Sequence, residues 1–221
     1  MIKIDTNTNV FVCSDSHFSH KNICRGVTSW RLPNGEIPAE QTRDFSTIEK
    51  MNTAIVNNIN EVVGQDDILI HCGDFSFGGF EQIGEFYNRL VCKNIHLILG
   101  NHDTHIEKNR ENIQDLFLSV SHYNTLEYKN RAGEIHKFVL CHYPICSWND
   151  MKKGVYHLFG HLHTPKQNKI MTGKSMDVGM DGNDLKPYNI DEIIRTLSGR
   201  PIAHNTLKND HHLDDMRGVV G

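Results

Sequence analysis

One short stretch near the start of the chain carries most of the information about its architecture: Val10-Phe11-Val12-Cys13-Ser14-Asp15-Ser16-His17. Its first four residues are apolar and rich in β-branched and aromatic side chains, which favours a buried strand. An aspartate and a histidine follow at once, and both side chains commonly bind metal ions. Four further runs have the same character and also lead into Asp, Asn or His. The five predicted strands are Val10–Cys13, Asp67–Cys72, Ile95–Leu99, Lys137–Cys141 and Val155–Phe159.

Helical patterns lie between and after these strands. Apolar residues recur at spacings of three and four, as in amphipathic helices. The predicted helices cover residues 45–63, 80–91, 113–118 and 189–197. Strands and helices alternate in the first half and strands gather in the second, which predicts one mixed α/β domain over residues 1–199. Residues 200–221 are expected to form a polar tail outside that domain.

The composition is that of an ordinary globular protein. Of the 221 residues, 38% are hydrophobic and 23% are charged, which excludes collagen-like, disordered and disulfide-scaffold classes. The net charge of −4 argues against strong non-specific DNA binding, because proteins that bind in that way are normally basic. No apolar run reaches the roughly 18 residues of a membrane span, and the N-terminus lacks a signal-peptide core. We therefore expect a cytoplasmic protein without a membrane partner.

Seven side chains with nitrogen or oxygen donors follow the predicted strands. Because the carboxyl ends of neighbouring strands meet at one edge of an α/β sheet, we expect these side chains to converge. Such donors without thiolate favour Zn, Fe, Mn, Ni or Co over Ca or a structural zinc site. Seven donors suit two ions about 3.5 to 4 Å apart, an arrangement that stabilises in-line displacement at phosphorus. The candidate ligands are Asp15, His17, Asp74, Asn101, His142, His161 and His163.

The same residues fall into five short blocks along the chain. The blocks are Asp15-x-His17, Gly73-Asp74, Gly100-Asn101-His102-Asp103, His142 and Gly160-His161-x-His163. Together they resemble the calcineurin-like metallophosphoesterase superfamily, in the family's order and over about two thirds of the chain. The resemblance implies a single domain in which two mixed β-sheets pack as a sandwich flanked by helices.

The resemblance also implies a role for each residue of the blocks. The first metal ion would be held by Asp15, His17 and His163, and the second by Asn101, His142 and His161. Asp74 would bridge the two ions, together with a hydroxide that attacks the phosphorus atom. His102 would stabilise the transition state or protonate the leaving oxygen, tasks that suit an imidazole.

The chain departs from the Ser/Thr protein phosphatases of this superfamily, which carry an acidic residue and an arginine soon after the Gly-Asp block. Here the block continues as Phe75-Ser76-Phe77-Gly78-Gly79, so we do not expect a protein phosphatase. The stretch from Ser14 to Ile23, Ser-Asp-Ser-His-Phe-Ser-His-Lys-Asn-Ile, instead resembles small stand-alone bacterial and phage phosphoesterases.

Residues 18–44 form an irregular, polar segment that begins directly after His17 and therefore beside the expected metal ions. Four of its polar side chains are candidates for contact with a substrate phosphate, and Trp30 is able to stack on a base. The four candidates are His20, Lys21, Asn22 and Arg25. The alternative interpretation is an ordinary surface loop held in place by its own tryptophan.

Other polar residues near the blocks have simpler interpretations. Asp177 and Asp181 are expected to form turns and to accept backbone hydrogen bonds rather than to bind metal. Asp103 is a candidate for orienting a neighbouring group, with a plain structural role as the alternative. Four histidines inside strand patterns are expected to support the site from behind or to lie at the surface. These are His71, His96, His136 and His157.

These observations favour a phosphoesterase that uses two divalent transition-metal ions, Mn, Fe, Zn or Ni, with Mn favoured. We expect it to hydrolyse a small phosphodiester, with a nucleotide or cyclic nucleotide as the favoured substrate. A phosphomonoesterase, or a nuclease that processes RNA or DNA ends, is the alternative within the same chemistry. A scaffold that has lost catalysis is disfavoured, because all seven ligands and His102 are present. The sequence does not indicate the oligomeric state.

Overall fold

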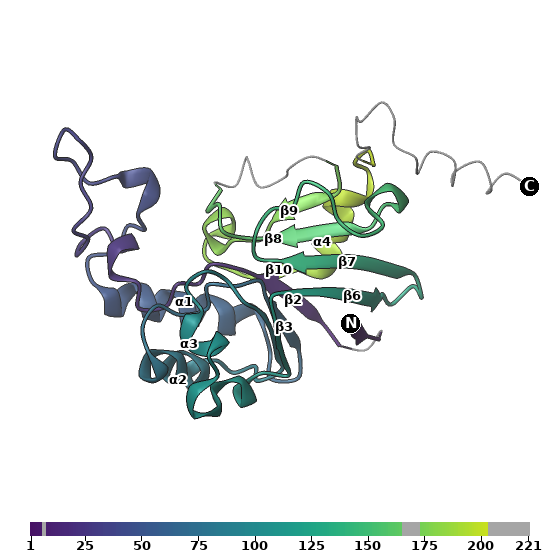
Figure 1. Ribbon diagram of the computed structural model, residues 1–221, viewed down its shortest axis with the longest axis horizontal. Coiled ribbons are helices and arrows are strands. Elements are labelled where there is room, and N and C mark those ends of the chain that lie inside the picture. The colour runs from purple at the N-terminus through teal and green to yellow at the C-terminus, as the bar shows by residue number, and fades with distance from the viewer. Residues whose placement is uncertain (6–7, 165–172, 203–221) are drawn as a thin grey trace, which may run out of the picture.

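Two five-stranded β-sheets face each other in the computed structural model, which describes residues 1–5, 8–164 and 173–202 (Figure 1). The first sheet has the order β1-β6-β7-β8-β9 and the second β10-β2-β3-β4-β5. The first sheet contains Ile2–Ile4 (β1), Tyr123–Lys129 (β6), Ile135–Cys141 (β7), Tyr156–Phe159 (β8) and Ser175–Asp177 (β9). The second contains Tyr188–Asn189 (β10), Val10–Cys13 (β2), Ile68–His71 (β3), Ile95–Ile98 (β4) and Ser119–Ser121 (β5). Both sheets are mixed, because β6 pairs antiparallel with β7 and β10 pairs antiparallel with β2.

Helices flank the two sheets. The α-helices are Ile48–Val62 (α1), Phe80–Arg89 (α2), Thr104–Glu107 (α3) and Ile190–Ser198 (α4). Short 3-10 helices occupy Lys21–Ile23, Ala39–Gln41, Arg110–Leu116, Met151–Lys153 and Met180–Asn183. The first three α-helices lie together beside the β2–β5 sheet, whereas α4 follows its edge strand β10 (Figure 1). None of the helices in the described ranges is long and apolar enough to cross a membrane.

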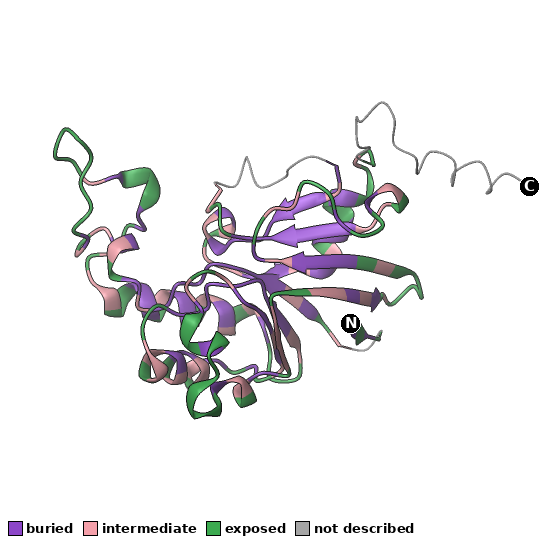
Figure 2. Cartoon of the chain, viewed as in Figure 1, coloured by how far each residue is buried: buried purple, intermediate pink, exposed green. Residues whose placement is uncertain are grey.

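The alternation of side chains along β2 explains why this strand lies at the centre of the molecule. Val10 and Val12 belong to the core between the two sheets, which also contains Phe138 of β7. Cys13 faces the other way and packs in the cluster that holds Met51 of α1. A strand buried on both faces is apolar at every position, because successive side chains point to opposite faces. The buried residues run through both sheets (Figure 2). The predicted sandwich of two mixed sheets flanked by helices is confirmed.

The structure confirms the five predicted strands and the helices predicted at residues 45–63, 80–91 and 189–197. The helix predicted at residues 113–118 is instead a 3-10 helix over Arg110–Leu116. Strands β1, β5, β6, β9 and β10 are not among those five, because they are very short or largely polar. Strand β6, for example, buries only Leu126 and Tyr128 among its seven residues.

Residues 18–44 leave the sheet edge and form a projecting arm (Figure 1). The base of the arm is closed by backbone hydrogen bonds, from Arg43 N to Ile23 O at 2.6 Å and from Arg25 N to Arg43 O at 2.9 Å. Its interior has little regular structure beyond two single-turn 3-10 helices. Of the tail predicted over residues 200–221, residues 203–221 lie outside the described residues.

Candidate metal centre

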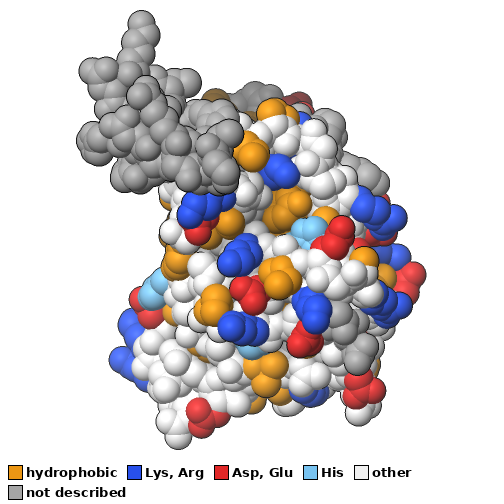
Figure 3. All heavy atoms as spheres, turned by 90° about the vertical axis from the view of Figure 1, so that its right-hand side faces the viewer, with side chains coloured by type: hydrophobic (Ala, Val, Ile, Leu, Met, Phe, Trp, Pro, Cys, Tyr) orange, Lys and Arg blue, Asp and Glu red, His pale blue; other side chains and the backbone are white. Residues whose placement is uncertain are grey.

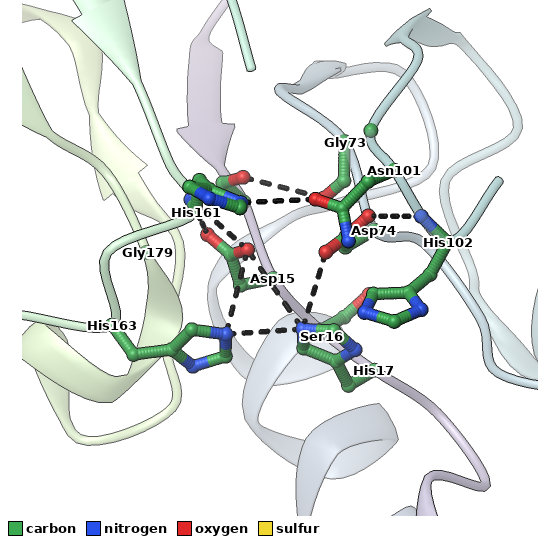
Figure 4. Close-up of polar contacts among 12 residues, drawn as sticks. Asp15, Ser16, His17, Gly73, Asp74, Asn101, His102, His161, His163 and Gly179 are labelled. Atoms are coloured by element: carbon green, nitrogen blue, oxygen red, sulfur yellow. Dashed lines mark hydrogen bonds and ion pairs between the residues drawn. The ribbon is translucent and has the colours of Figure 1, made fainter. Parts of the chain in front are cut away.

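The carboxyl ends of five strands bring the seven candidate ligands to one edge of the sandwich, and Figure 4 labels all of them except His142. Strands β2, β3 and β4 run parallel in one sheet, and β7 and β8 run parallel in the other. The candidates are Asp15 and His17 after β2, Asp74 after β3, Asn101 after β4, His142 after β7, and His161 and His163 after β8. Parallel strands end on the same side of a sheet, so residues far apart in the sequence meet there.

One group of donors gathers around His17. Its Nε2 atom lies 3.1 Å from Nε2 of His163 and 3.4 Å from Oδ2 of Asp74. The Oδ1 atom of Asp15 lies 3.7 Å from His163 Nε2 and 3.8 Å from His17 Nε2. All of these groups except the partly exposed His163 are buried, with 2% or less of the side chain exposed.

A second group gathers around Asn101. Its Oδ1 atom lies 2.9 Å from Nδ1 of His161 and 3.1 Å from Nε2 of His142. Nε2 of His142 is also 3.5 Å from Oδ2 of Asp74. The same carboxylate oxygen of Asp74 therefore borders both groups, which is the position required of a ligand shared by two ions.

The hydrogen bonds behind the rings leave lone pairs directed into these groups. His163 Nδ1 donates to Asp181 Oδ2 at 2.7 Å, and His142 Nδ1 donates to the carbonyl oxygen of Cys72 at 2.9 Å. The Nε2 atom of each neutral ring is then an acceptor. A lone pair on His163 Nε2 and the carboxylate oxygen of Asp15 3.7 Å away repel unless a proton or a cation lies between them. Bonds of about 2.0 to 2.2 Å to a common ion would place donor atoms at such separations, so these residues fit two divalent cations.

The backbone at five of the seven ligands adopts the left-handed region. The φ angles are 57° at Asp15, 48° at His17, 55° at Asp74, 73° at His161 and 49° at His163. Such conformations cost of order 1–3 kcal/mol per non-glycine residue and persist only where the surrounding structure imposes them. The left-handed conformations therefore lower the stability of the fold, and they turn these side chains back toward the sheet edge.

Glycines precede three of the ligands because the ligands of other strands lie against them. A Cβ atom at Gly100 would collide with the carboxylate of Asp74, and one at Gly160 would collide with the carboxylate of Asp15. The Gly-Asn and Gly-His blocks thus reflect close approach of backbone to ligand.

Burial governs the protonation of the cluster in the ion-free chain. Burial, reinforced by the charge of Asp74, raises the pKa of Asp15 to about 7, whereas His163 opposes this shift. Burial, together with His163 and Arg43, lowers the pKa of His17 well below its usual value. Bound cations would lower the pKa of Asp15 and would keep the pKa of His17 low, because cations favour ionised carboxylates and neutral imidazoles.

Asp103 orients the loops that carry two of the ligands. Its carboxylate accepts hydrogen bonds from the backbone N–H groups of Gly100 and Asp74, both at 2.8 Å, and of Phe75 at 2.9 Å. The side chain is 2% exposed, and all three of these bonds are to backbone groups. Asp103 therefore clamps the turn after β3 to the turn after β4.

Asp181 is more than the turn residue that the sequence predicted. Its carboxylate accepts from His163 Nδ1 and forms a two-point ion pair with Arg43, with Nε–Oδ1 at 2.7 Å and Nη2–Oδ2 at 2.9 Å. Although burial opposes it, these two partners hold the pKa of Asp181 well below its usual range. Asp181 does lie in a turn, the 3-10 helix Met180–Asn183, but it accepts from side chains rather than from backbone groups, and a turn-like local sequence does not reveal a contact with a histidine 18 residues away.

Arg43 belongs to no motif and was not predicted to support the site. Besides Asp181, its guanidinium donates to the carbonyl oxygens of Ser16 and Asp15, both at 2.7 Å. It therefore connects the projecting arm with the loop that carries two ligands. Arg43 lies in the irregular segment without any motif, so only its partners in space identify it.

Asp177 and two of the histidines have the supporting roles that were predicted. Asp177 accepts from Gly179 N and from Thr164 Oγ1, both at 2.7 Å. His71 lies behind the ligand loop with Nε2 2.8 Å from Ser16 Oγ, and His157 is buried in β8.

His102 faces the cavity beside the two donor groups (Figure 4). Its backbone N–H donates to Oδ1 of Asp74 at 2.8 Å, which fixes the residue relative to the shared ligand. Its ring centre lies 5.3 Å from that of His17 and 5.3 Å from that of Phe77. An aromatic ring thus flanks His102 on one side and a candidate metal ligand on the other.

A cavity of about 1070 Å³ lies over the donor groups. His20 and Asn22, two of the four substrate-contact candidates, line it. Lys21 is exposed and is not among the lining residues.

Arg25 does not reach the cavity. It donates to the carbonyl oxygens of Ala39 at 2.9 Å and Thr42 at 3.0 Å, and its Nη1 atom lies 3.3 Å from the carboxylate of Asp44. The expected phosphate contact of Arg25 is therefore corrected, because the guanidinium holds the two sides of the arm together.

Comparisons with known proteins cover most of the chain. A family model described as calcineurin-like phosphoesterase matches residues 8–196. An uncharacterized protein of Methanocaldococcus jannaschii, MJ1445, is 26% identical over 194 residues, which cover 85% of this chain and 90% of that protein. The crystal structure of AQ665, a protein of unknown function from Aquifex aeolicus, superposes with a TM-score of 0.59 at 23% identity. That match covers 86% of this chain and all of the other, and it shows a shared fold.

Proposed function

The chain belongs to the calcineurin-like phosphoesterase family, and we propose that it acts within this family as a two-metal phosphodiesterase on a small substrate, a nucleotide or cyclic nucleotide. Membership makes it a metal-dependent phosphoric ester hydrolase. The observation that carries the finer proposal is the convergence of seven donor side chains on two positions, with Asp74 between them and His102 beside them.

In the proposed hydrolysis, the metal ligands, the residues behind them and His102 have different roles. Two divalent ions held by the donor groups would supply a water nucleophile at neutral pH and neutralise charge on the phosphate oxygens. Asp103 and Asp181 hold ligand loops and ligand rings in place from behind. His102 lies at the cavity, where a histidine is suited to donate a proton to the leaving oxygen.

The charge of the cavity supports a diester as the substrate. Among the described residues that line it, Arg43 is the only lysine or arginine, and its guanidinium is already committed to Asp181 and two carbonyl oxygens. A phosphomonoester brings up to two negative charges to the site and a phosphodiester brings one. A cavity of about 1070 Å³ also has room for groups on both sides of a phosphate.

The charges around the cavity support a small substrate over a long nucleic acid, because Arg43 is the only lysine or arginine among the described residues that line it. Figure 3 shows the side of the molecule turned away from the arm of residues 18–44, and on that side lysine and arginine side chains are interspersed with aspartate and glutamate. Nucleic acids bind proteins largely through lysine and arginine contacts to phosphates. We further propose Mn²⁺ as the working metal and a cytoplasmic location, supported by the nitrogen and oxygen donors and by six free cysteines.

The test is hydrolysis of bis(p-nitrophenyl) phosphate and p-nitrophenyl phosphate, side by side, after chelator stripping and addition of Mn²⁺. We expect metal-dependent cleavage of both compounds with the diester faster. A faster monoester would replace the proposal with a phosphomonoesterase, and cleavage of short oligonucleotides in preference to both would indicate an end-processing nuclease. No turnover on any phosphoester would contradict the proposed activity.

A further inference from the structure

One wall of the cavity consists of aromatic side chains that the hydrolytic chemistry does not use. We call His20, Trp30 and Phe77 the aromatic wall. His20 and Phe77 stack face to face, with ring centres 3.9 Å apart and planes inclined by 12°. Trp30 meets His20 edge-on at 6.2 Å, and all three residues line the same cavity.

The two large rings of the wall are open to the cavity. Phe77 is 37% exposed and Trp30 is 36% exposed, whereas most aromatic side chains of this protein are buried. Exposed rings of this size bury apolar area when a flat ligand covers them, which favours binding. They come from two separate regions, the arm and the turn after β3, so the wall is assembled only in the folded protein.

His20 provides a second, independent sign of a ligand. Its side chain is 6% exposed, and its Nδ1 atom is buried without a hydrogen-bond partner. Buried polar atoms of folded proteins nearly always have a partner, so an unpaired one in a cavity wall points to a missing ligand or water. His20 also lies 5.1 Å from the ring of His17 and 5.7 Å from that of His102, between the wall and the metal centre.

The charges around the wall limit what can bind there. Glu40 lines the cavity and brings a negative charge, while Arg43 is held by its own partners. A second phosphate group near the wall would find no free lysine or arginine among the described lining residues. Two amides, Asn22 and Gln41, line the same cavity and are able to hydrogen-bond a polar ring edge.

We propose that the aromatic wall binds the uncharged planar base of a nucleoside whose single phosphate lies at the metal centre. This inference rests on the proposed phosphodiesterase function and narrows its substrate class to nucleoside phosphoesters with one phosphate. Stacking on aromatic side chains tolerates different bases, because every base has a π-face. Phe77 and Trp30 are then specificity-determining residues, and His20 completes the wall beside the phosphate.

The test compares adenosine 5′-monophosphate with ribose 5-phosphate, which has the same phosphate and sugar but no base. Binding to the Mn²⁺-loaded protein is measured by calorimetry. We expect the adenine compound to bind about 10- to 100-fold more tightly, the range of base stacking measured by substitution. Adenosine 3′,5′-bisphosphate, with a second separate phosphate, should bind no more tightly than the monophosphate. A gain of tenfold or more for the bisphosphate would overturn the single-phosphate part of the proposal.

Four variants separate stacking from folding. Phe77→Leu and Trp30→Leu remove a ring but keep apolar volume, and each should reduce the preference for the adenine compound severalfold while affinity for ribose 5-phosphate stays unchanged. Phe77→Tyr keeps the ring and should retain the preference. Tyr123→Leu removes a ring that is exposed on β6 and does not line the cavity, and it should have no effect.

Hydrolysis of bis(p-nitrophenyl) phosphate by the same preparations distinguishes the two proposals. Equal affinities for the two sugar phosphates in a protein that hydrolyses this diester would overturn the aromatic subsite and leave the phosphodiesterase function intact. Absence of metal-dependent hydrolysis would instead overturn the proposed function. A preference for the adenine compound that both leucine variants leave unchanged would also contradict the role of the wall.

Discussion

The edge formed by the strand ends and the arm of residues 18–44 face the same cavity but are held in different ways. At the strand ends, parallel backbone pairing between neighbouring strands fixes where each ligand emerges. The arm is positioned by a few contacts at its base, of which the Arg43 side chain makes four. The position of a residue at the end of a strand can be inferred from the sequence pattern. A single side-chain contact such as Arg43 with Asp181, 138 residues apart, cannot be inferred in this way. This difference agrees with our proposals that the strand ends supply the chemistry and that the arm, together with Phe77, supplies selectivity.

The strongest test of the strand-end region is Asp74→Asn. Because one oxygen of Asp74 borders both donor groups, we expect fewer than two bound metal ions and turnover at background. The asparagine retains an oxygen for the backbone N–H of His102, so folding should be preserved. Metal content by mass spectrometry and diester hydrolysis are the measurements. A variant that still binds two ions would refute the shared position of Asp74.

His102→Ala tests whether a residue at the same edge acts on the substrate rather than on the ions. Its ring lines the cavity, and only its backbone contacts Asp74. We expect both ions to remain bound and the rate to fall about 10²- to 10⁴-fold, as for loss of a positioned general acid. Metal analysis and kcat are measured on the same sample. Loss of metal from this variant would show that His102 is a metal ligand rather than a residue that acts on the substrate.

Asp181→Asn tests the connection between the two regions. The carboxylate joins His163 to Arg43 of the arm, and loss of a carboxylate that orients a metal-binding histidine costs about 10- to 100-fold in metal affinity. We expect that loss in a competition assay with a metal-binding dye. Asp191→Asn, whose carboxylate accepts from Tyr128 in the other sheet, is the matched control and should bind metal normally. Equal metal affinities for the two variants would show that Asp181 does not support the metal centre.

The smallest effect concerns the framework behind the strand ends. His157 accepts from Ile145 N at 3.1 Å and its Nδ1 lies 3.2 Å from Val139 O, and burial lowers its pKa to about 4. Between about pH 6.5 and 4 the unfolded chain therefore binds a proton that the folded chain does not.

The contribution of His157 to stability should thus be complete above about pH 6.5 and fall as the pH drops toward 4, with a slope of at most about 1.4 kcal/mol per pH unit. Urea unfolding of the wild type and of His157→Gln, at several pH values, measures it. The variant should lose less stability on acidification. Parallel curves for the two proteins would show that His157 is not the group responsible.

The sequence predicted the strand-end region well and the arm poorly. Apolar runs followed by Asp15, Asp74 or Asn101 identified strands and candidate ligands, because strand periodicity and strand direction are properties of the local sequence. Arg25 was expected at the substrate and instead holds the arm, since an irregular segment gives no direction to its side chains. The side-chain partners of Asp181 were missed because they are distant in the sequence.

The amino-acid sequence by itself determined the mixed α/β class, the five central strands and the set of candidate metal ligands, while the sandwich of two sheets was implied by the family resemblance. Tertiary structure alone decided that Asp74 borders both donor groups and that Arg43 supports His163 through Asp181. It also decided that Trp30 and Phe77 line one cavity. The physical reason is the separation along the chain over which each feature acts. Hydrophobic periodicity and glycine-flanked blocks are local, whereas ion pairs and ring contacts depend on distances that are set only when the chain is packed.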